Sequence, residues 1–114
     1  MVAQSDEEAL SIGRAAWPVF YDNFIKLWRK HGTQPVNAKL PPDFDSLIES
    51  GHAVAGSPTS VAALLREQID VGALNYLIGG FVFGSMPHRD AVQSIGLFAS
   101  DVMPALRKRE RAAA

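Results

Sequence analysis

One short stretch of the sequence carries groups suited to binding an anion. Gly56 and Ser57 stand before Pro58, where a helix is predicted to begin, and the free amides at a helix start can hold phosphate. The same residues also serve to cap a helix, because a serine hydroxyl accepts from the first amides and a proline at the first position loses no hydrogen bond. Capping and anion binding both remain open for this pair.

A second stretch joins a histidine to two phenylalanines. His88 follows an apolar run that ends in Phe81 and Phe83. An imidazole changes its protonation near neutral pH, so His88 can donate a hydrogen bond or carry a proton, and it can equally be a solvated residue at a helix start. Phe81 and Phe83 alternate with Val82, and side chains two positions apart in a strand point to the same face. The two rings are therefore predicted to line one surface, either a pocket or the packed core.

The residue types for several other kinds of site are missing or scattered. The 114 residues include no cysteine, which excludes thiolate nucleophiles, disulfides and thiolate metal ligands. His31 and His52 stand apart from carboxylates and from each other, so no metal site is predicted. The sequence contains no nucleophile elbow, phosphate-binding loop, dinucleotide glycine pattern or calcium loop.

The charge balance indicates no partner. Eleven basic and 12 acidic residues leave a net charge of -1, so nothing attracts nucleic acid or an anionic membrane. The polar, acidic N-terminus lacks the basic start and apolar core of a secretory signal. The most apolar run, residues 74–83, is about half as long as the ~20 residues that cross a membrane. A soluble cytoplasmic protein is therefore expected.

The first half of the chain is predicted to be a long helix followed by a loop. Ser5 and Glu8 have the spacing of a capping box, and the apolar residues after them recur every three or four positions. Gly32 is suited to end this helix, and Pro18 is expected to kink or break it. Residues 33–51 are rich in proline and predict a loop with one short helical turn.

The second half, residues 52–114, is predicted to form two strand-and-helix units. Residues 52–55 and 74–83 are apolar runs typical of strands that are covered on both faces. Helices are expected to follow from Pro58 and from His88. The inward face of the last helix is expected to carry Val92, Ile95, Phe98, Val102 and Leu106.

This order of elements indicates an α/β fold, a single partial domain with the regions 1–32, 33–51 and 52–114. Short connections favour right-handed crossovers and parallel strands. Two parallel strands leave unpaired edges, which indicates that neighbouring strands are missing. A (β/α)8 TIM barrel needs roughly 250 residues, so the chain would supply about its last quarter.

Several motifs resemble the end of the luciferase-like flavin-dependent monooxygenases. They are Ala55-Gly56-Ser57-Pro58, Asp70-Val71-Gly72, Phe83-Gly84-Ser85-Met86-Pro87-His88, and residues 94–107, in which a leucine-phenylalanine pair precedes valine, methionine, proline and a basic residue. The resemblance is good from His52 to Arg107 and weaker over the first helix.

The resemblance implies the C-terminal portion of a TIM barrel, with residues 52–55 and 74–83 as its seventh and eighth strands. It implies an enzyme that uses reduced FMN and O2 to oxygenate a small organic substrate in a site that excludes water. Phe81 and Phe83 would then border the flavin or substrate pocket, and Gly56 and Ser57 would contact the cofactor. His88 would be the catalytic residue. Alkanesulfonate-oxidising relatives carry a tyrosine where Phe81 stands, so their substrate is not implied.

Two alternatives remain open. The same superfamily includes oxidoreductases that pass a hydride between a flavin or deazaflavin and a substrate without oxygen. A different class of function is a non-catalytic truncated remnant or oligomerising module, whose exposed strand edges pair with another chain. In each case the chain is expected to need the missing N-terminal barrel portion or self-association, and activity of this piece alone is not expected.

Overall fold

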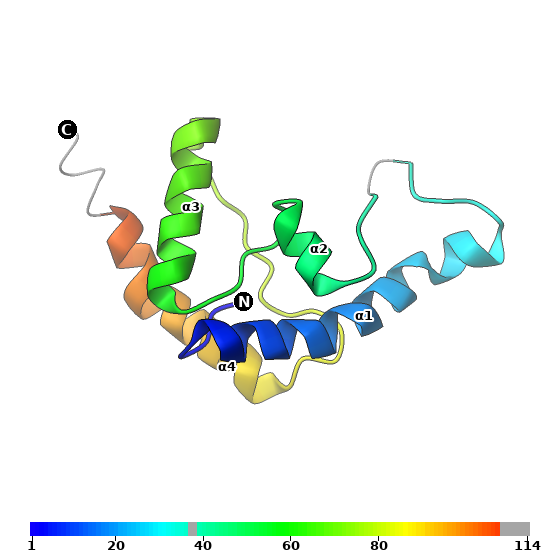
Figure 1. Ribbon diagram of the computed structural model, residues 1–114, viewed down its shortest axis with the longest axis horizontal. Coiled ribbons are helices and arrows are strands. Elements are labelled where there is room, and N and C mark those ends of the chain that lie inside the picture. The colour runs from blue at the N-terminus through cyan, green and yellow to red at the C-terminus, as the bar shows by residue number, and fades with distance from the viewer. Residues whose placement is uncertain (37–38, 108–114) are drawn as a thin grey trace.

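The protein is helical over the part of the chain that its computed structural model describes, residues 1–36 and 39–107 (Figure 1). Its elements are α1 (Asp6–Lys30), α2 (Phe44–Glu49), α3 (Pro58–Gly72), α4 (His88–Leu97) and the five-residue π-helix η1 (Phe98–Val102). Helical turns continue after η1 to residue 107. The described ranges contain no strand, and an isolated parallel bridge joins Val2 to Gly56.

Local capping explains where α1 begins and ends. The Glu8 amide donates to the Ser5 hydroxyl at 3.1 Å, and the Glu8 carboxylate accepts from the Gln4 amide at 3.1 Å. Gly32 follows the helix with a φ of 66°, the left-handed conformation that glycine adopts without strain. Of the kink or break predicted at Pro18, the break is wrong, because α1 runs through this residue. A proline removes one hydrogen bond of the helix, and the packing of α1 against α2 holds the two halves in one element.

The two following helices also begin at side-chain caps, and the cap of the second, at Ser57, was predicted. The Ser46 amide donates to the Asp43 carboxylate at 2.8 Å, which starts α2. The Ser60 amide donates to the Ser57 hydroxyl at 3.4 Å, and Pro58 takes the first position of α3. α3 ends at Gly72, and Ala73 after it adopts the left-handed conformation with a φ of 49°.

The prediction of an α/β fold, a TIM-barrel fragment with two parallel strands, is wrong for the described residues. Residues 74–83 are extended without a strand partner, and residues 52–55 lead only to the single bridge at Gly56. An apolar run favours an extended, covered backbone, but a strand also requires a neighbouring backbone in register. α3 packs on η1 and α1 packs on α2, so helices cover helices where the prediction had helices covering a sheet.

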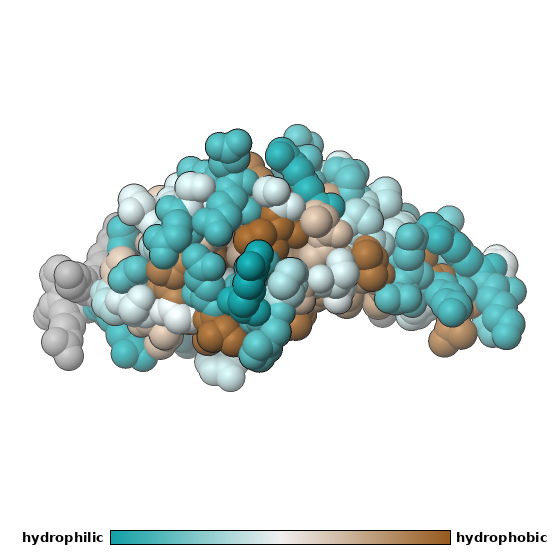
Figure 2. All heavy atoms as spheres, turned by 90° about the horizontal axis from the view of Figure 1, so that it is seen from below, coloured by the Kyte–Doolittle hydropathy of each residue, from teal (hydrophilic) through white to brown (hydrophobic). Residues whose placement is uncertain are grey.

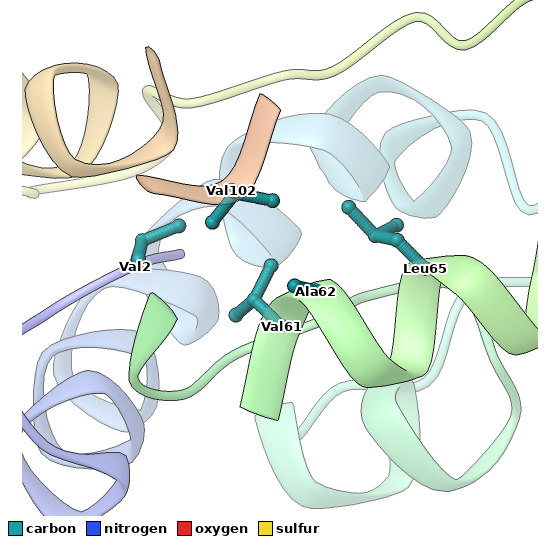
Figure 3. Close-up of a cluster of buried hydrophobic side chains, with 5 residues drawn as sticks. All are labelled: Val2, Val61, Ala62, Leu65 and Val102. Carbon is teal, nitrogen blue, oxygen red and sulfur yellow. The ribbon is translucent and has the colours of Figure 1, made fainter. Parts of the chain in front are cut away.

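One apolar cluster joins the two ends of the described chain. Figure 3 shows Val2, Val61, Ala62, Leu65 and Val102 pointing toward one another from the N-terminal segment, α3 and η1. Ser94 of α4 is fully buried beside this cluster, and its hydroxyl accepts from the Val2 amide at 2.9 Å. This contact satisfies a backbone donor that burial removes from water.

A second cluster lies where α1 crosses α2. Trp17, Phe44 and Leu47 are buried there, and Phe83 packs against them from the extended segment. The indole N–H of Trp17 donates to the carbonyl oxygen of Pro41 at 2.9 Å. Phe83 also packs against the small cluster of Ala16, Met86 and Ala91, so this ring ties the end of the extended segment to α1, α2 and α4.

The predicted inward face of the last helix is partly wrong. Val92 and Ile95 are exposed, whereas Val102 is buried as predicted. The buried face of α4 consists of Asp90, Ala91 and Ser94. Small side chains at positions 91 and 94 let the backbone of α4 approach its neighbours, so the helix turns this face inward.

Candidate functional site

An apolar groove lies between the helices and the extended segment. Its volume is about 450 Å³, and it is open to solvent on one side. We call it the apolar groove, and its side chains include Trp17, Phe20, Phe44, Leu47, His52, Val61, Leu65, Gln68, Phe81, Phe83 and Phe98. No Lys, Arg, Asp or Glu side chain lines it within the described ranges. Such a surface suits a flat, uncharged ring system.

Phe81 and Phe83 form one wall of the apolar groove. The ring of Phe81 meets Phe98 edge-on at a centroid distance of 5.0 Å. The ring of Phe83 stacks on Phe44 at 5.9 Å and meets Trp17 edge-on at 6.1 Å. Both rings are half-buried, so each is held in place on one side and faces the groove on the other.

Gly56 and Ser57 stand at the start of α3, where a carboxylate already lies. The Ser57 amide donates to Asp6 Oδ1 at 2.6 Å, and the Ser60 hydroxyl donates to Asp6 Oδ2 at 3.0 Å. The Ser57 amide is the main cause that lowers the pKa of Asp6, followed by the Ser60 and Ser57 side chains. This helix start binds an anionic group, and the group it binds belongs to α1. An external anion would have to displace Asp6, so cofactor binding at Gly56 and Ser57 stays a prediction.

The structure does not bring His88 to the two phenylalanines. His88 is the exposed first residue of α4 and is not among the residues that line the apolar groove. His52 lines it instead, and its Nδ1 lies 2.8 Å from the Ser50 hydroxyl. The sequence contained no signal for His52 beyond its place at the start of an apolar run. A catalytic role of His88 remains a prediction.

The described residues contain neither a cluster suited to a metal ion nor a helix suited to crossing a membrane. They contain no group of three or more His, Asp or Glu side chains placed to hold a metal ion. None of the helices in the described ranges combines the length and the apolar character that crossing a membrane requires. A hollow of about 650 Å³ lies beside the end of α1, bordered by Tyr21, Trp28 and Arg29 among others, and it contains none of the predicted site residues.

Comparison with known proteins gave one informative match. No family model matches the sequence. Over 103 residues the chain is 31% identical to the uncharacterized protein y4wF of Sinorhizobium fredii (strain NBRC 101917 / NGR234). The match takes in 90% of this chain and 30% of y4wF, so the chain spans less than a third of the length of this relative.

Proposed function

We propose that this chain is the C-terminal part of a flavin-dependent monooxygenase and supplies an apolar wall to its flavin and substrate site. The observation that carries the proposal is the uncharged apolar groove with Phe81 and Phe83 along one side. The resemblance of residues 52–107 to luciferase-like monooxygenases supports the same assignment. Reduced FMN and O2 are the proposed co-reactants, and the substrate is a small organic molecule.

The described residues fit the ring system of FMN but not its phosphate. The apolar groove suits the flat ring system, because aromatic side chains border it and no charged side chain competes with the ring for contact. The phosphate has no basic partner there. The helix start at Ser57, the predicted phosphate contact, already holds the carboxylate of Asp6. Residues outside this chain would therefore hold the phosphate.

Bound reduced FMN would supply the reaction with O2. The contribution of this chain is to hold the ring and to keep water from it. Phe81 and Phe83 offer aromatic surface to the ring and no group that donates a proton. The imidazole of His52 borders the apolar groove, and its Nδ1 contacts the Ser50 hydroxyl.

The length of y4wF supports the proposal that this chain is one part of a larger enzyme. The matched region is 30% of y4wF, and the remaining 70% has no counterpart in the 114 residues. The apolar groove is open on one side, where such additional chain would close it. We therefore expect this chain alone to bind flavin weakly and to show no turnover.

The test is a chimera in which this chain replaces the matching region of y4wF. Flavin affinity is measured by fluorescence quenching, and O2 consumption is measured with reduced FMN. The variant Phe81→Ala is expected to weaken flavin binding at least tenfold, because a ring that borders the pocket is removed. Val71→Ala is the control, since Val71 is 84% exposed and is not among the residues that line the apolar groove.

The outcomes separate the candidate functions. A folded chimera that binds no flavin would refute the proposal. Hydride transfer from a reduced deazaflavin without O2 consumption would assign the chain to the other oxidoreductases of the superfamily. Equal flavin affinity of the Phe81→Ala and Val71→Ala variants would show that Phe81 does not border the flavin site.

A further inference from the structure

The extended segment, residues 74–83, has a backbone without partners. No backbone hydrogen bond within the described chain involves residues 75–82, and the flanking bonds run from the Leu74 amide to Ile69 and from the Met86 amide to Phe83. Every residue from 71 to 80 is exposed. Free amides and carbonyl groups in an extended conformation are the edge to which another extended backbone adds.

The side chains of the extended segment alternate between two faces. Tyr76, Ile78 and Val82 are 78%, 84% and 67% exposed, and Ile78 and Val82 also border the apolar groove. Leu77 is less exposed, at 42%, and Phe81 and Phe83 are half-buried against the helices. Over residues 76–83 this is the two-residue period of a strand with one more exposed face, whereas Leu74, at 46%, is about as exposed as Leu77. The more exposed side chains, Tyr76, Ile78 and Val82, are therefore largely uncovered within the described residues.

The whole chain exposes more surface than a monomer of its size should. Its accessible surface is 7718 Å², whereas a compact monomer of 12.3 kDa exposes roughly 6,100 Å². Its radius of gyration is 15.5 Å, against about 13 Å for a compact domain of this length. Figure 2 shows the elongated outline, with hydrophobic patches among hydrophilic surface. Part of this additional accessible surface is therefore available to a partner.

We propose that two copies of this chain associate by antiparallel pairing of their extended segments, with Ile78 of one copy opposite Ile78 of the other. This register places Tyr76 opposite Gly80 and Leu74 opposite Val82. A bulky ring then covers the position that lacks a side chain, so the segment is complementary to itself.

Charge and area both favour a second copy as the occupant. No charged residue lies between Asp70 and Arg89, so the two segments meet without repulsion between like charges. The exposed side chains of the segment offer on the order of 500 Å² of apolar surface in each copy; they are Leu74, Tyr76, Ile78 and Val82. Pairing also covers the free backbone, so the total covered area approaches the ~800 Å² per partner of a stable interface. The pairing does not depend on the proposed function, because flavin takes no part in it.

The first test is a cysteine cross-link, since the chain contains no cysteine of its own. In the proposed register, Ile78→Cys places two thiols directly opposite each other, at a separation that a disulfide spans. We expect this variant to form a covalent dimer under mild oxidation. Val71→Cys is the control: Val71 is also 84% exposed but lies outside the extended segment, so its dimer should form at least tenfold more slowly.

The second test is the oligomeric state by sedimentation at micromolar concentration. The unmodified chain is expected to be a dimer. Ile78→Lys sets two like charges face to face and should raise the dimer dissociation constant at least tenfold without changing helix content, whereas Val71→Lys should leave it unchanged.

Each opposite outcome overturns the proposal. A chain that is monomeric at 50 µM, on the scale of ordinary specific complexes, does not pair with itself. Equal cross-linking of the Ile78→Cys and Val71→Cys variants places the contact elsewhere. A chain that stays monomeric and pairs only with the remaining part of y4wF has a different occupant. None of these measurements uses flavin, so they fail or succeed separately from the proposed function.

Discussion

Replacing Gly84 with alanine should release the extended segment from α1. Gly84 has a φ of 57°, in the left-handed region, and a Cβ built on it would lie 1.8 Å from the carbonyl oxygen of Ala16 and 3.0 Å from the amide nitrogen of Phe20. Those atoms belong to the backbone of α1, so they cannot turn aside as a flexible side chain would. The chain must therefore move away from α1 at this point.

The magnitude follows from the contacts that this movement disturbs. A non-glycine residue in the left-handed conformation costs about 1 kcal/mol. Phe83, the preceding residue, loses some of its packing on Phe44 and Trp17, and each aromatic pair contributes about 1 kcal/mol. Gly84→Ala should therefore lower the free energy of unfolding by about 3 kcal/mol. For a chain of this length, that corresponds to a fall in Tm of roughly 10–15 °C.

The assay is thermal unfolding followed by circular dichroism, with Gly80→Ala as the matched control. No atom lies within 4 Å of a Cβ at Gly80, so the same chemical change in the same segment should alter stability by less than about 0.5 kcal/mol. If the Gly84→Ala protein melted within 2 °C of the control, about half a kcal/mol on the same scale, the close approach to α1 would be refuted.

Three further substitutions test the packing of the helices. Gly13→Ala should cost about 2 kcal/mol in spite of a better helix propensity, because the new Cβ would lie 2.0 Å from the buried ring of Phe44. Ser94→Ala should cost about 1–3 kcal/mol by denaturant unfolding, because the buried Val2 amide loses its acceptor. Asp6→Asn should reduce the loss of folding stability that acidification causes. The pKa of Asp6 is lowered in the folded chain, so its contribution to stability is present above about pH 4 and is lost as the pH falls through the folded pKa.

Matched controls decide these three outcomes. Gly96→Ala, in a helix with nothing within 4 Å, should stabilise the chain by about 0.5–1 kcal/mol; a loss as large as that of Gly13→Ala would contradict the clash. Ser11→Ala, at an exposed helical site, should be nearly neutral, and a cost equal to that of Ser94→Ala would show that the buried hydrogen bond contributes nothing. If the exposed Asp101→Asn altered the acid transition as much as Asp6→Asn did, the Asp6 contacts would not be its cause.

The helix ends were predictable because their causes are local. Ser5, Ser57 and Pro58 act on amides within three residues of themselves, so the spacing along the chain contains all the information that the cap needs. The same holds for Gly32, whose left-handed conformation depends on its own missing side chain. These starts and stops were predicted correctly.

The fold class was not predictable in the same way. The apolar run of residues 74–83 predicted a strand covered on both faces, whereas residues 74–80 are exposed and the described residues contain no partner strand. A β-strand requires hydrogen bonds to a second backbone, and the sequence of one segment does not specify where that second backbone lies.

The candidate site likewise has some features that the sequence determined and others that it did not. The sequence by itself determined that Phe81 and Phe83 share a face and that Ser57 starts a helix, because both follow from the period or the cap of one segment. Only the tertiary structure decided that Asp6 occupies that helix start, that His52 rather than His88 borders the apolar groove, and that Phe83 reaches Trp17 and Phe44. The contacts of Asp6 and Phe83 join residues 39 to 66 positions apart, and no local pattern specifies which distant segments meet when the chain buries its apolar surface.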